Sequence, residues 1–287
     1  MTALVTPFRN GEFDEQAYRD LIDWQIASGT DALIPCGTTG ESATLSHEEH
    51  DRVVEVCIDA ANRRVPVIAG AGSNSTAEAL RLTRHAREAG ADGALLITPY
   101  YNKPTQEGLY QHYRHIAENV EIPIVMYNVP SRTGVNLLPE TVARLADLAN
   151  IVGVKEATAD MDQVSRIVQL CGDRVAVISG DDFTVLPLLA VGGKGVISVV
   201  TNVAPADMAT LVDAFFDGNL EKAAEMHHRI SPLAAAMFLE TNPIPVKTAL
   251  GMMGRIDPEL RLPLVPMSEG ARAKLDKALR SYGLLKN

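Results

Sequence analysis

The sequence predicts an α/β protein that folds as a (β/α)8 TIM barrel with a C-terminal helical appendage. Eight short apolar segments recur along the chain, and their starts lie 19 to 35 residues apart, which suits a strand followed by a crossover helix. Amphipathic helical patterns fill the intervals, and polar side chains follow the apolar segments. A doubly wound open sheet is the alternative, but such a sheet does not need eight units.

Strands and helices are predicted to alternate over the first 218 residues. The strands are expected at residues 3–5, 32–34, 67–69, 94–97, 124–127, 152–155, 176–179 and 195–199. The helices are expected at residues 14–27, 46–63, 75–89, 106–119, 139–148, 161–171, 183–191 and 205–216. The second helix opens with a capping box formed by Ser46 and Glu49. We therefore predict that residues 1–218 form the catalytic barrel.

The strand signal stops after Asn219, and helical patterns broken by prolines continue to the end of the chain. Helices are expected at residues 220–239, 246–253 and 268–282. Residues 219–287 are thus predicted to form a C-terminal helical region with too little apolar material for a core of its own.

The composition excludes several classes of protein. A net charge of -10 over 287 residues and a pI of about 5.2 disfavour surfaces that bind nucleic acid or anionic membranes. The three cysteines show neither Cys-x-x-Cys nor zinc spacing, and no apolar run reaches the ~18 residues of a membrane span. The first residues carry no basic segment followed by an apolar one. We expect a cytoplasmic protein whose partners are small molecules.

The sixth predicted strand ends in a charge at Lys155, where an apolar residue would be expected. One interpretation is a snorkelling lysine, or one that is ion-paired with Glu156. The other is an amine that burial keeps neutral, and such an amine is a nucleophile that forms a Schiff base with a carbonyl substrate. A lysine with a pKa near ~10.4 is neutral in about one molecule in 2,500 at pH 7, and a shift of ~3 units would make that about a quarter.

Other polar side chains follow neighbouring strands, at the barrel end where active sites lie. Those with useful chemistry are Thr38, Thr39, Tyr101, Tyr127 and Arg132. Phenols pass protons, and an arginine binds a carboxylate through two hydrogen bonds. Carboxylates and imidazoles are too few at these strand ends for a metal site. The set therefore predicts carbonyl chemistry on an anionic oxo acid.

Three further motifs are weaker. His47 and His50 flank two glutamates but are three residues apart, whereas a zincin helix needs four. The loop 70–75 lacks the third glycine of a dinucleotide loop, because Ser75 occupies that place. The loop 192–195 precedes a strand and therefore favours a tight turn over a phosphate site.

The motifs together resemble the dihydrodipicolinate synthase family of pyruvate-dependent class I aldolases. They cover the whole chain in order: Gly37-Thr-Thr-Gly-Glu41, Tyr100-Tyr-Asn-Lys-Pro-Thr105, Tyr127-Asn-Val-Pro-Ser-Arg-Thr-Gly134, Gly153-Val-Lys-Glu-Ala157, Ser179-Gly-Asp-Asp182 and Asn242-Pro-Ile-Pro-Val-Lys247. The resemblance implies condensation of pyruvate with L-aspartate 4-semialdehyde, in lysine biosynthesis through diaminopimelate. It also implies that no organic cofactor and no catalytic metal take part.

The resemblance further implies roles for single residues. Lys155 would form the Schiff base with pyruvate, and Tyr127 would move protons during its formation. Thr38 would link Tyr127 to Tyr101, which a neighbouring subunit would contribute. Arg132 would hold the carboxylate of the semialdehyde. The pyruvate portion would be held by Thr39 and by the backbones of Gly180 and Ile197.

A second, allosteric site is implied as well. In lysine-inhibited members of the family the end product binds near a dimer interface, which predicts feedback inhibition by L-lysine here. The matching residues are Ser42, Ala43, His47, His50, Asn74, Glu78 and Tyr100. The resemblance also implies a homotetramer, a dimer of tight dimers. The first strand is expected to be short, because few residues precede it.

Two other functions compete with this one. N-acetylneuraminate lyase or a 2-keto-3-deoxy sugar acid aldolase would share Lys155 and Tyr127, but these relatives generally lack an arginine at the position of Arg132. The paired Thr38 and Thr39 are also typical of the synthase. A non-catalytic barrel that senses an oxo acid or lysine would gain no covalent adduct on Lys155.

Overall fold

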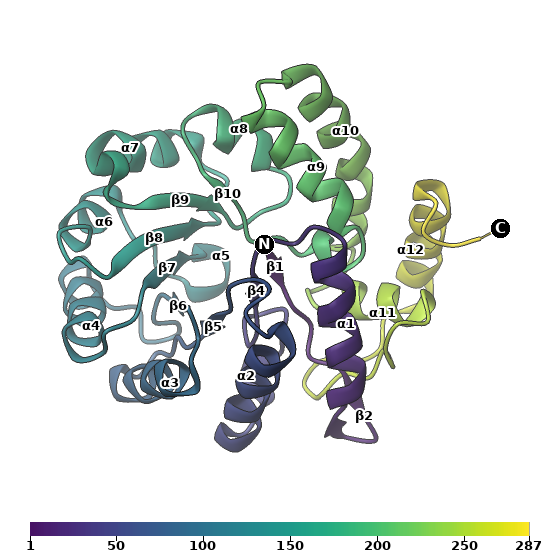
Figure 1. The fold of residues 1–287 in the computed structure, drawn as a ribbon, viewed down its shortest axis with the longest axis horizontal. Helices are drawn as coiled ribbons and strands as arrows, with labels where there is room; N and C mark the ends of the chain where they lie inside the picture. The colour runs from purple at the N-terminus through teal and green to yellow at the C-terminus, as the bar shows by residue number, and fades with distance from the viewer. Residues whose placement is uncertain (287) are drawn as a thin grey trace. The chain divides into compact units, whose positions relative to one another are not determined.

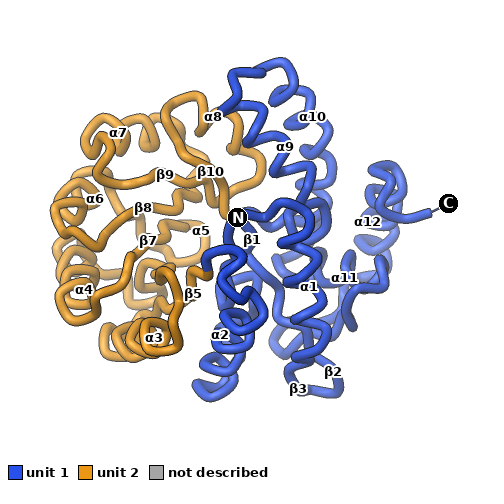
Figure 2. Tube along the Cα trace, viewed as in Figure 1, with its two compact units in different colours: residues 1–66, 198–287 blue, residues 67–197 orange. Residues whose placement is uncertain are grey.

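The computed structural model describes residues 1–286, which fall into two compact units (Figure 2). Unit 1 combines both ends of the chain, Met1–Pro66 and the residues from Ser198 onward, and unit 2 is Val67–Ile197. Segments of the predicted barrel occur in both units. The boundary at residue 218 between barrel and helical region stays a prediction.

Unit 2 is built on a six-stranded parallel sheet in which neighbours along the chain are neighbours in the sheet (Figure 1). Its strands are β5 (Ile68–Gly70), β6 (Gly93–Ile97), β7 (Ile124–Asn128), β8 (Ile151–Glu156), β9 (Ala176–Ser179) and β10 (Gly195–Val196). All β7 residues are buried, as expected for a parallel strand covered on both faces. The sheet thereby aligns the carboxyl ends of its strands.

Helices connect successive strands of unit 2, and α3, α4, α6 and α7 follow one another along the outside of the sheet (Figure 1). The helical elements are α3 (Thr76–Ala89), α4 (Gln106–Asn119), α5 (Pro130–Thr133), α6 (Pro139–Leu145), α7 (Met161–Cys171), the 3-10 helix η2 (Gly172–Arg174) and α8 (Val185–Ala190). Side chains of Ser75, Thr105 and Asp160 accept backbone hydrogen bonds at the starts of α3, α4 and α7. These caps fix where each helix begins and hence how long each strand-to-helix loop is.

Unit 1 holds the remaining strands and the C-terminal helices. Its elements are β1 (Thr2–Ala3), β2 (Phe8–Arg9), β3 (Glu12–Phe13), α1 (Glu15–Ala27), β4 (Leu33–Ile34), the 3-10 helix η1 (Ser42–Thr44), α2 (His47–Ala61), the 3-10 helix η3 (Val200–Asn202), α9 (Pro205–Phe216), α10 (Leu220–Ala236), α11 (Ile244–Met252) and α12 (Glu269–Tyr282). Strand β1 pairs in parallel with β4, and Thr2 also bridges to Ser198. The capping box predicted for α2 is present.

The eight predicted strands all occur, most with ends shifted by one or two residues, and β10 ends three residues early. The sequence analysis missed the antiparallel pair β2 and β3. Its turn is Asn10-Gly11, with φ of 55° and 82°, and such a dipeptide between short apolar segments is the usual sign of a two-residue hairpin. The three cysteines are free and buried. Within residues 1–286 no helix is long and apolar enough to cross a membrane.

The loop 70–75 owes one of its glycines to a close backbone approach. A Cβ atom on Gly72 would lie 2.3 Å from the backbone nitrogen of Ile97 on β6. Only glycine fits there without moving the strand. This packing accounts for part of the resemblance of this loop to a dinucleotide loop.

We expect Gly72→Ala to lower the free energy of unfolding by about 2–3 kcal/mol. The new methyl group would overlap the backbone of Ile97, which cannot move without displacing strand β6. Urea denaturation would measure the change. The matched control is Gly270→Ala in α12, where a Cβ meets nothing within 4 Å and the stability should change by less than about 0.5 kcal/mol. Equal midpoints for the two variants would contradict this account.

Candidate functional site

Lys155 lies near the carboxyl end of β8 and is 5 % exposed. Tyr127, on β7, is its partner in the strand register. Residues in register on adjacent strands point to the same face of a sheet, and the Nζ atom of Lys155 lies 4.2 Å from the centre of the Tyr127 ring. The structure thus brings the predicted amine and the predicted phenol together.

Burial lowers the pKa of the Lys155 ammonium from its usual value to about 8. The negative charge of Asp182 opposes this shift, whereas the positive charge of Arg132 adds to it. At pH 7 about one molecule in ten then carries the neutral amine. The sequence analysis did not single out Asp182, which is 4 % exposed. Its place at the end of the motif Ser179-Gly-Asp-Asp182, just after a predicted strand, was the available signal.

Gly180 gives Lys155 the space that its side chain needs. A Cβ atom at this position would lie 3.0 Å from Cε of Lys155 and 2.8 Å from Cβ of Ala157. The Gly180 amide donates to the carbonyl of Glu156 at 2.7 Å, which holds the residue beside the strand end. Ile197 is fully buried, and its amide donates to the Ser179 carbonyl at 2.9 Å. The predicted contacts of both backbones with pyruvate stay predictions.

Arg132 and Tyr101 are exposed residues of loops in unit 2. Arg132 lies in the short helix α5, directly after β7, and its amide donates to the Val129 carbonyl at 2.9 Å. Tyr101 follows β6 in a left-handed conformation, with a φ of 72°, and is 90 % exposed. A residue other than glycine rarely adopts this conformation. The phenol of Tyr101 therefore projects from its own chain.

Glu156 does not pair with Lys155, contrary to one of the two sequence interpretations. Glu156 is 2 % exposed, and its carboxylate accepts hydrogen bonds from the backbone amide of Thr158 at 2.9 Å and from the side-chain amides of Asn128 and Gln163 at 3.1 Å. Burial raises its pKa, and these hydrogen bonds oppose the rise. Lys155 and Glu156 are successive residues of a strand, so their side chains leave opposite faces.

The Glu156 carboxylate belongs to a network that anchors the loop carrying Arg132. Asn136, at the end of this loop, accepts from Asn128 at 2.8 Å and donates to Gln163 at 2.8 Å. The Leu137 amide donates to Asn128 at 2.9 Å. Both ends of the segment from Asn128 to Leu137 are thus tied to β7, β8 and α7. Sequence reasoning missed this network, because amide side chains carry no periodic signal.

Thr38 and Thr39 lie in unit 1, in the tight turn between β4 and η1. The amide of Gly40 donates to Gly37 and that of Glu41 to Thr38, both at 3.1 Å. Thr39 is 3 % exposed, and its hydroxyl accepts from Nδ2 of Asn242 at 3.0 Å. The predicted relay from Tyr127 through Thr38 to Tyr101 stays a prediction.

The residues of the predicted lysine site are divided between the two units. Ser42 and Ala43 lie in η1, whereas His47 and His50 lie in the first turn of α2. In unit 2, Glu78 is in the first turn of α3, where its side chain accepts from Ser73, and Asn74 precedes this helix. Tyr100 is 37 % exposed. Whether these residues form one site stays a prediction.

No group of three or more histidine, cysteine, aspartate or glutamate residues within residues 1–286 is placed to hold a metal ion. The motif from His47 to His50 therefore does not belong to such a group in this part of the chain.

Comparisons with known proteins give one consistent result. The model of the Dihydrodipicolinate synthetase family matches residues 1–282. The curated 4-hydroxy-tetrahydrodipicolinate synthase of Syntrophus aciditrophicus (strain SB) is 64% identical over 285 residues, which cover 99% of this chain and 98% of the relative. The corresponding protein of Nitratidesulfovibrio vulgaris (strain DSM 19637 / Miyazaki F) is 61% identical, with the same coverage.

Solved structures of synthases superimpose on nearly the whole chain. Dihydrodipicolinate synthase from Aquifex aeolicus superimposes with a TM-score of 0.98 at 50% identity, covering 100% of this chain and 98% of that one. The Acinetobacter baumannii synthase complexed with pyruvate has a TM-score of 0.97 at 47% identity, covering 99% and 98%. The Cyanidioschyzon merolae synthase with lysine bound has a TM-score of 0.96 at 42% identity, covering 99% and 97%.

This agreement confirms the predicted α/β barrel and the predicted enzyme class, a Schiff-base-forming lyase of the class I aldolase type. A match that spans residues 1–282, together with relatives more than 60% identical over nearly their full length, shows that the chain belongs to the Dihydrodipicolinate synthetase family.

Proposed function

We propose that this chain condenses pyruvate with L-aspartate 4-semialdehyde, the reaction of a 4-hydroxy-tetrahydrodipicolinate synthase in lysine biosynthesis. The observation that carries the proposal is the buried Lys155, whose pKa of about 8 makes its amine a nucleophile near neutral pH. The curated relatives are synthases, and one related structure holds pyruvate. These similarities support pyruvate as the first substrate.

The proposed reaction begins when the neutral Nζ of Lys155 attacks the keto carbon of pyruvate. Loss of water gives an imine, and removal of a methyl proton gives an enamine, so the lysine itself takes up the electrons. The ring of Tyr127 lies against Nζ, 4.2 Å from its centre, and we assign the phenol of this residue to moving protons in these steps. No organic cofactor or metal is required by this sequence of steps.

The enamine carbon then attacks the aldehyde carbon of the semialdehyde, and a proton is delivered to the new alkoxide. The amine of the same substrate displaces Lys155 by transimination, which closes the ring and frees the lysine. We assign Arg132 to the substrate carboxylate, and Thr38 and Tyr101 to the relay that carries protons to and from Tyr127. Thr39 and the backbones of Gly180 and Ile197 are assigned to the pyruvate portion.

The sugar acid aldolases remain the competing function. They would share the steps up to the enamine and differ in the aldehyde that follows. Arg132 favours the semialdehyde, because its guanidinium matches a short carboxylate better than a sugar chain. The identity of the curated relatives favours the synthase as well.

Assembly and regulation extend the proposal. We propose a homotetramer built from two tight dimers, in which the exposed Tyr101 enters the site of the neighbouring subunit. L-lysine is proposed as a feedback inhibitor that binds Ser42, Ala43, His47, His50, Asn74, Glu78 and Tyr100. The related structure with lysine bound supports this ligand. The cytoplasmic location stays a prediction.

The first test is capture of pyruvate on Lys155 over a range of pH. Only the neutral amine attacks a carbonyl, so the rate of adduct formation should rise about tenfold per pH unit below 8 and level off above it. Short incubations quenched with borohydride, followed by mass spectrometry of the peptides, would measure this rate. Lys155→Met should abolish the adduct, and Lys194→Met, at an exposed position, should not. A rate that keeps rising to pH 10 would argue against a lowered pKa.

The second test separates the two substrates. We expect the protein to condense pyruvate with L-aspartate 4-semialdehyde in a coupled assay, and to cleave no sugar acids. Arg132→Ala should raise KM for the semialdehyde by at least about tenfold, because a charged hydrogen-bond pair contributes about 1.5–3 kcal/mol. It should also shift the pH profile of pyruvate capture upward, because the Arg132 charge lowers the pKa of Lys155.

The matched control is Arg132→Lys, which keeps the charge but loses the planar fork. It should retain the pH profile and still raise KM for the semialdehyde. Cleavage of a sugar acid would favour the competing function. Equal losses for both substrates in Arg132→Ala would argue against the role assigned to Arg132.

The third test concerns regulation. We expect L-lysine at millimolar concentration to reduce turnover by more than half, and D-lysine to have much less effect. Glu78→Ala removes a carboxylate suited to the lysine ammonium and should weaken inhibition about tenfold. Steady-state rates at several lysine concentrations would measure both effects. Turnover that is indifferent to L-lysine would remove the allosteric site from the proposal.

A further inference from the structure

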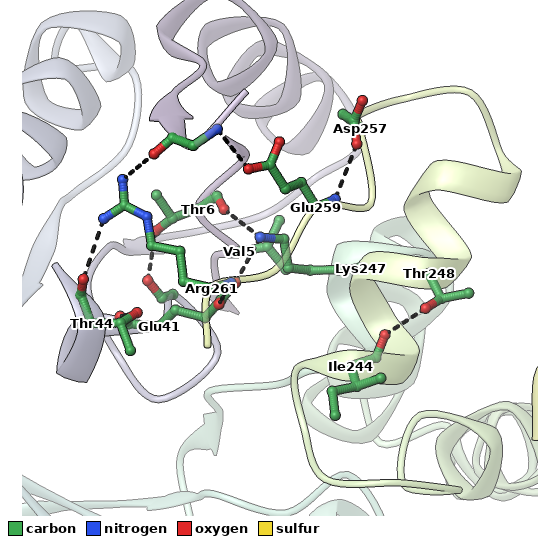
Figure 3. Close-up of polar contacts among 12 residues, drawn as sticks. Val5, Thr6, Glu41, Thr44, Ile244, Lys247, Thr248, Asp257, Glu259 and Arg261 are labelled. Atoms are coloured by element: carbon green, nitrogen blue, oxygen red, sulfur yellow. Dashed lines mark hydrogen bonds and ion pairs between the residues drawn. The ribbon is translucent and has the colours of Figure 1, made fainter. Parts of the chain in front are cut away.

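A fully buried lysine of the C-terminal helices contacts the loop that carries Thr38 and Thr39. Lys247 lies in α11 and is 0 % exposed (Figure 3). Its Nζ atom donates to Oε1 of Glu41 at 2.6 Å and to the carbonyl of Thr6 at 2.9 Å. It also lies 4.3 Å from the centre of the Phe8 ring. Nothing in the proposed chemistry uses this ion pair.

Glu41 is the last residue of the motif Gly37-Thr-Thr-Gly-Glu41 and has an unusual backbone. Its φ is 53°, in the left-handed region, and its side chain is 1 % exposed. A residue other than glycine holds this conformation only where its surroundings enforce it. The carboxylate also accepts from the amide of Arg261 at 3.2 Å. Two groups from the C-terminal region therefore fix the side chain of Glu41.

The same region contacts the loop at two further points. Nδ2 of Asn242, directly before α11, donates to the hydroxyl of Thr39 at 3.0 Å. The guanidinium of Arg261 donates to the carbonyl of Thr44 at 3.2 Å (Figure 3). It also donates to both oxygens of Glu49, at 2.6 and 2.7 Å. Residues 39 to 49 are thus contacted by three side chains that lie about 200 positions later in the chain.

The direction of the Asn242 contact matters for chemistry. A hydroxyl has one proton to donate, and because the Thr39 oxygen here accepts from an amide, that proton stays available for an acceptor other than Asn242. A carboxylate of a bound oxo acid is such an acceptor. Asn242 thus sets the polarity of Thr39, and the Lys247–Glu41 pair sets the position of the turn that carries it.

Stability alone accounts poorly for a buried ion pair. Removing two charges from water is so costly that an apolar pair of similar volume is often as stable or more so. A pair with short, directed hydrogen bonds does fix geometry, which an apolar pair does not. Burial lowers the pKa of Lys247, and the adjacent Glu41 carboxylate opposes that change.

We propose that the C-terminal helical region positions the loop 37–44 for pyruvate binding, with Lys247 acting through Glu41 and Asn242 acting through Thr39. Both are positioning residues rather than catalytic ones. This inference rests on the proposed function, because Thr39 is assigned there to the pyruvate portion.

The test compares three variants by steady-state kinetics and by borohydride capture of pyruvate, each corrected for the folded fraction. Replacing both charges in Glu41→Met/Lys247→Met avoids an unpaired buried charge and keeps the volume. We expect KM for pyruvate to rise at least about tenfold, and kcat/KM to fall by up to about a hundredfold, because small misplacements are costly in catalysis. Asn242→Ala, which leaves the ion pair intact, should raise KM for pyruvate in the same direction.

The pH profile of pyruvate capture and a control variant separate positioning from a purely structural role. The pH profile of pyruvate capture should keep its midpoint near 8, because the charges that set the pKa of Lys155 are those of Asp182 and Arg132. The control is Lys222→Met, which breaks an exposed pair with Glu225 in α10 and should change neither KM nor capture.

The test variants are Glu41→Met/Lys247→Met and Asn242→Ala. If a variant that folds keeps the wild-type KM for pyruvate, the inference is overturned, even if that variant unfolds at a lower temperature. The wild-type protein reports separately on the proposed function. If it captures no pyruvate, the function fails, and if it captures pyruvate while the folded variants do so equally well, only the positioning role fails.

Discussion

The chemistry of this protein depends on keeping one ammonium group out of water. Lys155 lies near the end of β8, and burial lowers its pKa to about 8. The strand register places the Tyr127 ring against the amine, and the missing side chain at Gly180 makes room for the methylene groups. A parallel sheet supplies all three conditions at once, because its strands end together and its interior is dry.

Two polar networks fix loops that carry residues assigned to the proposed reaction, one network in each unit. In unit 2 the Glu156 carboxylate and three amide side chains fix the loop of Arg132. In unit 1 Lys247, Arg261 and Asn242 hold the turn of Thr39. In both cases a buried carboxylate joins segments that are distant in the sequence, and its oxygens are satisfied by directed donors.

Most of the fold and the central pair of the site could be predicted from the sequence, because hydrophobic periodicity and spacing report on burial. Lys155 was recognisable as a charge at the end of an apolar segment. The hydrogen-bond partners of Glu156 could not be recognised in the same way. The side chain of Glu156 leaves the strand on the face opposite to Lys155, so the adjacent lysine is not its partner. The pairing of Lys247 was also missed, although the residue belongs to one of the motifs, because its partner Glu41 lies 206 residues away and only the folded chain brings them together. The hairpin at Asn10-Gly11 was overlooked, although an Asn-Gly dipeptide between short apolar segments predicts a hairpin turn.

Unit 1 is assembled from both ends of the chain, and this has a consequence for synthesis on the ribosome. The turn of Thr38 and Thr39 emerges early, yet the cation that neutralises Glu41 is made more than two hundred residues later. Until then a carboxylate destined for a dry environment has no counter-charge, so water must continue to solvate it. The turn of Thr38 and Thr39 can therefore reach its final packing only after translation is nearly complete.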